Sequence, residues 1–339
     1  MKNEDGLLKA GTKLADAQVS LPFYQPFVAE VQSSPVIADD AASLLTLTAG
    51  NLSVGFDKET GALISYKEGS TELIKEALRP NFWRPVTDND MGNGMNKTLR
   101  PWRDAGRQAK LLSMKQKALG KEVYEVVSHY KLPVGESDFI VTYHFSGKGY
   151  LDVNCTFIPG NDTLPLLPRM GVSITLNRQF SQMEWLGRGP HENYIDRNTS
   201  SYVGLYKGSV ADQYFPYDRP QENGNKTEVR WMSLTDTAGQ GLMVVGQPYV
   251  STSAYLFPTE DLDEPGLRKS QRHLSDIQFK DMVTWNIDLK QMGVGGDTSW
   301  GAYPHQPYLI PAERMSFSFR FCPAKQNGVS GNRQYLNFK

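Results

Sequence analysis

The feature that most restricts the fold of this chain is a long succession of short β runs. From Ser43 onward, apolar and polar residues alternate over segments that Gly, Asn and Asp separate, a pattern typical of antiparallel sheet. Residues 139–145 and 316–321 show the alternation most clearly. The predicted strands are 44–48, 52–56, 62–66, 122–129, 138–145, 150–158, 170–176, 229–234, 242–245, 283–289 and 315–321.

Helical patterns are few. Residues 98–110 could hold one short helix, with Pro101 near its start. No internal repeat of fixed period is present, which disfavours propellers and solenoids. Many strands with almost no helix predict an all-β fold, a large antiparallel sandwich or barrel. A length of 339 residues suits one large β domain with a short additional segment.

The first 38 residues differ from the rest of the chain. One strand is predicted from Lys13 to Pro22, and the residues after it, which include Pro26 and Pro35, are typical of a linker. A lone strand cannot bury a face by itself. We therefore expect residues 1–38 to be the end of a preceding domain with its linker, and residues 39–339 to form the main domain.

The charge balance excludes two classes of partner. The chain has 36 basic and 37 acidic residues and a formal net charge of −1, whereas nucleic acids and anionic membranes are bound by basic surfaces. No apolar stretch of about 18 residues occurs, and the polar N-terminus lacks the apolar core of a secretory signal. We expect a soluble protein, cytoplasmic or periplasmic. Cys155 and Cys322 lack neighbours at metal-ligand spacing, which favours two buried free thiols and leaves one bridge as the alternative.

Two polar stretches interrupt the strand pattern. Residues 78–90 contain two arginines and two aspartates, which predicts a long loop held by Arg–Asp pairs. Asp88, Asn89 and Asp90 could alternatively form a cation site, although their spacing is not that of an EF-hand loop. In the second stretch, residues 184–197, His191 and Glu192 suggest an acid/base pair. Adjacent residues of an extended chain point to opposite faces, so a scaffold of buried charges is the favoured interpretation. The candidate groove or scaffold residues are Arg188, His191, Glu192, Asn193, Arg197, Glu222, Asn223 and His273.

Residues 293–301 combine four glycines with Asp297, Ser299 and Trp300. Glycine reaches backbone conformations closed to other residues, and Asp and Ser side chains can fix such a loop by local hydrogen bonds. A tryptophan held out by a stiff loop suits stacking on a sugar ring. The alternative is a tight turn whose tryptophan folds back into the core.

Taken together, four ordered stretches resemble the C-terminal small-chain region of the large β-galactosidases of glycoside hydrolase family 2. The stretches are 79–90, 187–197, 222–224 and 293–300, and the resemblance runs from about residue 40 to the end. Residues 1–22 resemble the last strands of the immunoglobulin-like domain that precedes this region in the family. The resemblance implies a β-supersandwich of the galactose-mutarotase-like type.

The resemblance also implies a role in sugar binding. Trp300 would reach the active-site mouth of a barrel domain, with Asp297 and Ser299 as further substrate-binding residues. Some family members carry Gln where this chain has His191, so that side chain receives no individual role. The implied partners are a β-galactoside, the barrel and immunoglobulin-like domains of the same protein, and a possible second copy of it.

The catalytic machinery is expected elsewhere. Retaining glycosidases need two carboxylates about 5–5.5 Å apart, and in this family both lie on the barrel. The resemblance therefore implies a non-catalytic C-terminal part that is inactive alone, with no catalytic residue and no cofactor; Mg or Na would belong to other domains. Two alternatives stay open. One is a free-standing aldose epimerase using His191, Glu192 or His273, and the other is a carbohydrate-binding or structural module.

Overall fold

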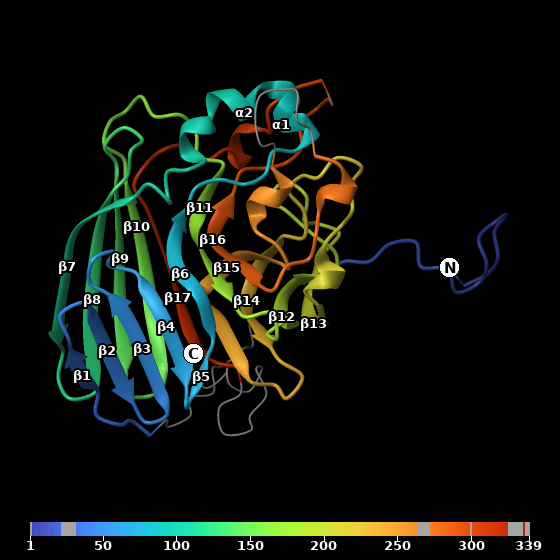
Figure 1. The fold of residues 1–339 in the computed structure, drawn as a ribbon. Helices are drawn as coiled ribbons and strands as arrows, with labels where there is room; N and C mark the ends of the chain where they lie inside the picture. Colours follow the sequence, from blue (N-terminus) through green and yellow to red (C-terminus); the bar gives the residue numbers. More distant parts are fainter. Residues whose placement is uncertain (1, 22–31, 264–271, 299, 325–334, 336–339) are drawn as a thin grey trace.

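Two antiparallel sheets form the body of the protein (Figure 1). The computed structural model describes residues 2–21, 32–263, 272–298, 300–324 and 335. The five-stranded sheet contains, in order, β1 (Ile37–Asp40), β2 (Leu44–Ala49), β3 (Leu52–Asp57), β4 (Leu63–Glu68) and β5 (Thr71–Glu72). The twelve-stranded sheet contains β6 (Ile74–Asn81), β7 (Lys110–Ala118), β8 (Val123–Lys131), β9 (Asp138–Ser146), β10 (Tyr150–Ile158), β11 (Arg169–Leu176), β12 (Gln182–Gly189), β13 (Tyr202–Ser209), β14 (Lys226–Thr235), β15 (Gly241–Tyr255), β16 (Val283–Gln291) and β17 (Met315–Pro323).

The larger sheet divides at the long strand β15. The first part of β15, from Leu242 to Gln247, pairs with β17 and continues through β10, β9 and β8 to β7. Its second part, from Ser251 to Tyr255, pairs with β16, which leads to β11 and β6. On the other edge of β15, β14 connects to β12 and β13. This branching brings the ends of β11, β14 and β16 together.

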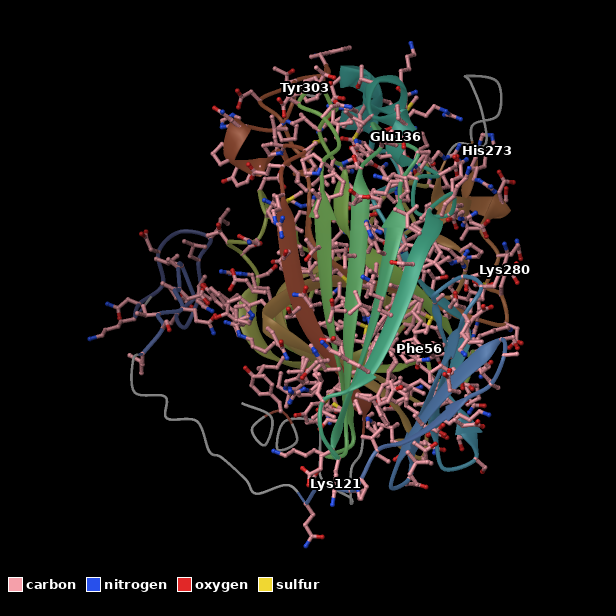
Figure 2. All side chains as sticks on the ribbon, turned by 90° about the vertical axis from the view of Figure 1, so that its left-hand side faces the viewer. Phe56, Lys121, Glu136, His273, Lys280 and Tyr303 are labelled. Carbon is pink, nitrogen blue, oxygen red and sulfur yellow. The ribbon has the colours of Figure 1, made fainter. Side chains whose placement is uncertain are left out.

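Burial follows the sequence pattern. Along β9 and β10, buried and half-buried residues alternate, as expected for a sheet with one face on the core. Strands β11 and β16 are buried on nearly every residue, because structure covers both of their faces. The sheets join through side chains such as Phe56 of β3 (labelled in Figure 2), whose ring lies edge-on to Tyr143 of β9 at 4.9 Å between centroids. The supersandwich predicted from the sequence is confirmed, and so are all the strands predicted from 44 onward.

The helices lie before the predicted position. They are α1 (Asp88–Asn93) and α2 (Met95–Thr98), followed by short 3-10 turns at Arg100–Trp102, Ala211–Gln213, Thr259–Leu262, Leu274–Asp276 and Gln306–Tyr308. The helix predicted over 98–110 is wrong. Thr87 caps α1 instead, with a reciprocal hydrogen bond to Asp90, and Gly94 ends that helix in the left-handed region at φ 81°.

The N-terminal segment carries no strand among its described residues 2–21. It has one isolated bridge, between Asp5 and Leu8, and Figure 1 shows it extending away from the sheets. The strand predicted from Lys13 is therefore wrong for these residues, since none of them pairs with a strand in the described part of the chain. Gln18 links the segment to the body, because its side chain exchanges two hydrogen bonds of 2.7 Å with the backbone of Val203. The assignment of residues 1–38 to an immunoglobulin-like domain stays a prediction.

Two further expectations concern the thiols and the membrane. Cys155 and Cys322 are both buried and free, as predicted. Burial raises the pKa of both thiols well above the ordinary value, so they stay protonated near neutral pH. Among the described residues, no helix combines the length and apolar character needed to cross a membrane.

Candidate functional site

Three side chains from other parts of the chain hold the base of the glycine-rich loop. Arg84 Nη2 donates to Gly293 O at 3.1 Å, and Asn89 Nδ2 donates to Val294 O at 3.2 Å. Gly295 N donates to Asp196 Oδ2 at 2.7 Å. The stretches around residues 84–89, 196 and 293–295 are therefore one structural unit, although they are far apart in sequence.

Close backbone packing explains two of the loop glycines. Gly301 lies at φ +100°, and a Cβ there would stand 2.4 Å from the carbonyl oxygen of Gly92 in α1. A Cβ on Gly296 would stand 2.5 Å from the carbonyl oxygen of Ala302. Only glycine fits either position without displacement of the backbone. The loop therefore rests on α1, at the end of the sheets where Figure 1 places both helices.

Trp300 is 91% exposed at the end of this anchored loop. The alternative in which it folds back into the core is therefore not what the structure shows. Asp297 pairs with His305 at 2.7 Å on the exposed side of the loop. Ser299, the third predicted substrate-binding residue, lies outside the described residues. The sugar-binding roles of Trp300 and Asp297 remain predictions.

A buried ion pair connects this loop to α1. Arg84 and Asp90 are 0% and 1% exposed, and the guanidinium donates to both carboxylate oxygens at 2.6 and 3.1 Å. Thr87 N also donates to Asp90, at 2.8 Å. On the surface, Asp88 accepts from Arg219 at 2.7 Å and from Gln221 at 3.0 Å. The predicted Arg–Asp pairing is present, but residues 78–90 are not one long loop, because 78–81 belong to β6 and 88–90 to α1. Within the described residues, no group of three or more His, Cys, Asp or Glu is placed to hold a metal ion.

His191 and Glu192 contact different partners. His191 Nε2 lies 3.2 Å from Ser200 Oγ and 2.9 Å from Ser201 Oγ. Glu192 accepts from Arg197 at 2.6 Å, from the Tyr217 hydroxyl at 2.5 Å and from Gly224 N at 2.7 Å. The structure thus favours a scaffold over an acid/base pair.

Arg188 and Asn193 also hold backbone segments together. Arg188 Nε pairs with Glu228 at 2.6 Å, and its Nη1 donates to the carbonyl oxygens of Asn198 and Ser201. The buried Asn193 accepts from the backbone N–H and the hydroxyl of Thr227 at 2.8 and 2.5 Å. Both residues fix the turn that follows β12.

The remaining predicted residues, Asn223 and His273, have mainly local contacts. Asn223 is buried and closes a local turn, accepting from Phe215 N at 3.2 Å and donating to Gln221 O at 2.9 Å. His273 precedes a 3-10 turn, where its backbone N–H donates to Asp276 at 2.8 Å. Figure 2 places His273 well apart from Tyr303, which follows the glycine-rich loop. His273 therefore does not join the other candidates.

A pocket of about 270 Å³ lies where all four of the sequence motifs meet. We call it the Tyr194 pocket. Its lining includes Asn89, Glu192, Tyr194, Arg197, Gln221 and Glu222, together with Val294 of the loop. Within this lining, the Glu222 side chain is fully buried beside Arg169 at 3.4 Å, and burial raises the pKa of its carboxyl.

Sequence reasoning missed Arg169 and Asp288, which complete a buried cluster with Glu222. Arg169 Nε lies 3.4 Å from Asp288 Oδ2, and all three side chains are 0% exposed. Burial, the main cause, raises the pKa of Asp288 to about 7, although Arg169 acts against the shift. The sequence signal for this cluster was a charged residue inside a largely apolar strand, such as Asp288 in β16.

We expect Asp288→Asn to remove a pH dependence of stability. A carboxyl whose folded pKa, about 7, exceeds its ordinary value of 3.8 stabilises the fold at low pH, and that contribution is lost as pH rises through 7. Asparagine mimics the protonated carboxyl and does not ionise in the unfolded chain, so the stability of the variant relative to wild type should increase by about 1–3 kcal/mol between pH 5 and pH 8.5. Urea unfolding at both pH values measures this, with the exposed Asp88→Asn as control. Parallel pH profiles for wild type and Asp288→Asn would contradict it.

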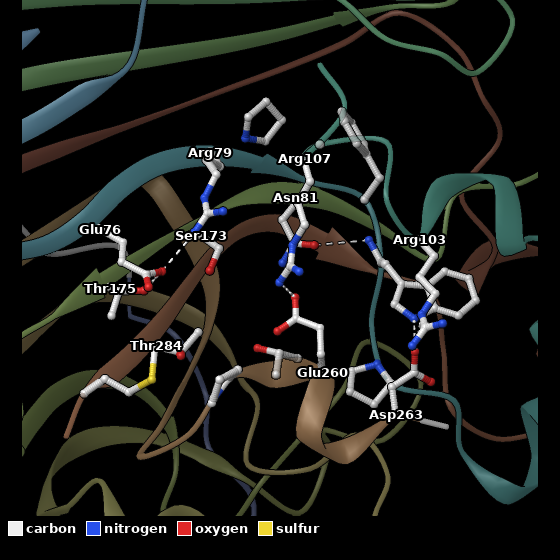
Figure 3. Close-up of a pocket in the computed structure, with 18 residues that line it drawn as sticks. Glu76, Arg79, Asn81, Arg103, Arg107, Ser173, Thr175, Glu260, Asp263 and Thr284 are labelled. Carbon is white, nitrogen blue, oxygen red and sulfur yellow. Dashed lines mark hydrogen bonds and ion pairs between the residues drawn. The ribbon is translucent and has the colours of Figure 1, made fainter. Parts of the chain in front are cut away.

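A second pocket of about 270 Å³ lies between β6 and the 3-10 turn at Thr259–Leu262 (Figure 3). Three arginines line it, and each has a carboxylate partner. Arg79 pairs with Glu76 at 2.9 Å, Arg103 with Asp263 at 2.8 Å, and Arg107 with Glu260. None of the residues singled out as groove or substrate candidates lines this pocket.

One protein family and its members match most of the chain. Residues 48–321 match the family described as Beta galactosidase small chain. The chain is 37% identical over 308 residues to a β-galactosidase of Priestia megaterium (strain DSM 319 / IMG 1521), covering 90% of this chain and 29% of that protein. It is 33% identical over 302 residues to a β-galactosidase of Lactobacillus delbrueckii subsp. bulgaricus, covering 87% of this chain and 28% of that protein. The chain thus spans less than a third of the length of these relatives. Among solved structures, galactose 1-epimerase from Lactobacillus acidophilus NCFM aligns with a TM-score of 0.49 and 9% identity, over 87% of this chain and 99% of that one.

Proposed function

The chain belongs to the β-galactosidase small-chain family, and from this premise we propose that it is the non-catalytic part of a β-galactosidase that completes the sugar pocket of a catalytic domain. The observation that carries the proposal is Trp300, which is 91% exposed on a loop whose base is fixed by Arg84, Asn89 and Asp196. A large apolar ring in water gains free energy when a ligand covers it. A sugar that the catalytic domain holds against Trp300 would cover the ring in this way.

The proposal extends to the partners of the chain. The relatives are more than three times as long as the matched region, which supports a role within a larger protein. We propose that a barrel domain and an immunoglobulin-like domain supply the rest of the enzyme, that a β-galactoside is its substrate, and that a second copy can associate with it. The end of the sheets that carries α1 and the glycine-rich loop would face the barrel.

The alternative of a free-standing epimerase has less support. That reaction needs a general acid and a general base facing one groove. His191 is held by Ser200 and Ser201, Glu192 by Arg197 and Tyr217, and His273 lies elsewhere. An NMR measurement of α/β-galactose interconversion by the purified chain tests this alternative, and we expect no acceleration over buffer.

In the complete β-galactosidase, we expect Trp300→Ala to raise KM about tenfold while kcat changes little. An aromatic ring that stacks on the bound sugar is worth about 1–1.5 kcal/mol, which corresponds to this factor. Steady-state kinetics with lactose and with a nitrophenyl β-galactoside measure the effect. Trp300→Phe should fall between the alanine variant and wild type.

The control is Leu205→Ala, which truncates an apolar side chain that is 47% exposed on β13, away from the loop. Its KM should equal that of wild type. An unchanged KM for Trp300→Ala would return the loop to a purely structural role.

A further inference from the structure

We propose that the pocket between β6 and the 3-10 turn at Thr259–Leu262 binds one neutral sugar ring, through polar groups that its floor and its charged rim leave free (Figure 3). We call it the Arg79 pocket. None of the described residues that line it belongs to α1, α2 or the glycine-rich loop, so it lies outside the surface that we assign to the barrel domain. The proposal goes beyond the proposed function and does not depend on it, because every lining group belongs to this chain.

The floor of the Arg79 pocket is a polar face of two paired strands. Arg79 of β6 and Ser173 of β11 are register partners, so their side chains stand next to each other on one face of the sheet. Ser173 is half-buried and lines the pocket, yet its hydroxyl makes no hydrogen bond within the described part of the chain. A half-buried hydroxyl in this position is both a donor and an acceptor that a ligand can reach.

Two ion pairs at the rim also leave hydrogen-bonding groups free. Arg79 Nη2 donates to Glu76 Oε2 at 2.9 Å, and Arg107 Nη2 donates to Glu260 Oε1. The second oxygen of each carboxylate and the remaining guanidinium N–H groups have no partner among the residues that the structure describes. The four side chains are between 42% and 52% exposed. A ligand in the pocket can therefore contact them without displacing either pair.

The balance of charge selects a neutral ligand. Three arginines line the pocket, and each is paired with a carboxylate that also lines it. A bound anion would lie beside these carboxylates, and a bound cation would lie beside the guanidinium groups. Sugar hydroxyls suit both kinds of neighbour, because a hydroxyl can donate to a carboxylate oxygen and accept from a guanidinium N–H.

The shape of the Arg79 pocket suits a single ring. Its walls are joined by a largely buried ion pair, in which Arg103 Nε lies 2.8 Å from Asp263 Oδ2, and Trp83 Nε1 donates to the same oxygen at 3.0 Å. The half-buried Pro80 and Met282 add apolar surface for the C–H face of a sugar. The volume of about 270 Å³ lies just below the range of about 300–1,000 Å³ that holds drug-sized ligands.

The test is a ligand-observed NMR titration of the 339-residue chain with D-galactose. We expect saturable binding with a Kd of about 1–10 mM and no displacement by an equal concentration of inorganic phosphate. Ser173→Ala should weaken binding about fivefold, the loss of one neutral hydrogen bond, and Arg79→Met about tenfold, the loss of a charged donor. Both variants should melt close to wild type, because the first loses no hydrogen bond within the described protein and the second breaks only an exposed ion pair.

Lys117→Met is the matched control. Lys117 is 63% exposed and pairs with Glu125 at 3.1 Å across β7 and β8, and it does not line the pocket. This variant should keep the affinity of wild type. Absence of saturable binding up to about 100 mM sugar, wild-type affinity in both Ser173→Ala and Arg79→Met, or displacement of the sugar by phosphate would each overturn the proposal.

Discussion

Replacing Arg84 by methionine is expected to lower the free energy of unfolding by about 3–5 kcal/mol. Arg84 is 0% exposed and donates to both oxygens of Asp90, which is itself 1% exposed. Methionine keeps much of the side-chain volume but leaves the Asp90 carboxylate buried without its cation. The backbone N–H of Thr87 would be its main remaining donor.

The same change should loosen the glycine-rich loop, because Gly293 O loses the hydrogen bond from Arg84. Chemical denaturation monitored by tryptophan fluorescence measures the stability. The matched control is Arg79→Met, which breaks an ion pair with Glu76 whose side chains are 42% and 47% exposed. Exposed pairs contribute about 0–1 kcal/mol, so this control should stay close to wild type.

The double variant Arg84→Met with Asp90→Asn sharpens the test. If Arg84→Met loses stability because the Asp90 carboxylate is left without a cation, removal of that charge by Asp90→Asn should recover part of the lost stability. Equal stability of Arg84→Met and Arg79→Met would contradict the prediction, and so would a double variant less stable than either single one.

The strands that sequence reasoning located are those with a simple burial pattern. Strands β9 and β10 alternate because one face lies on the core, and β16 is apolar because both faces are covered. The strands missed lie mostly at edges. β7 is rich in lysine and largely exposed, and β6 contains Pro80, which an edge strand tolerates because one side of its backbone needs no partner.

The candidate site was predictable in part. The motifs at 187–197 and 293–300 were singled out from the sequence, and the structure joins them through Asp196 and Gly295. The buried Arg169–Glu222–Asp288 cluster was not predicted, because its members are neighbours only through the pairing of β11 with β16 and the approach of the segment before β14. Which charged side chains meet in a core depends on how distant strands pair, and that pairing cannot be read from a single sequence.

The chain by itself is expected to hydrolyse a nitrophenyl β-galactoside at least about 10⁶-fold more slowly than a complete β-galactosidase, because glycosidase-scale acceleration requires the full catalytic constellation. A retaining mechanism needs one protonated carboxyl and one free carboxylate that can attack the sugar. In the Tyr194 pocket, burial raises the pKa of Glu222, but the side chain is fully buried beside Arg169 at 3.4 Å and is not placed to protonate a sugar. Glu192, which also lines this pocket, is fixed by hydrogen bonds from Arg197, Tyr217 and Gly224, as expected for a scaffold residue.

The measurement compares the purified chain with a full-length relative, such as the β-galactosidase of Priestia megaterium, at equal molar concentration. Trace contamination by a host enzyme is the main source of false activity, so Glu222→Gln and Glu192→Gln serve as controls. Residual turnover that both variants leave unchanged comes from outside this pocket. Turnover within about tenfold of the full-length enzyme that either variant abolishes would place catalysis in this chain and contradict its assignment as the non-catalytic part. Absence of turnover is the outcome that the proposed role of the chain predicts, because in this family the catalytic pair is expected on the barrel domain.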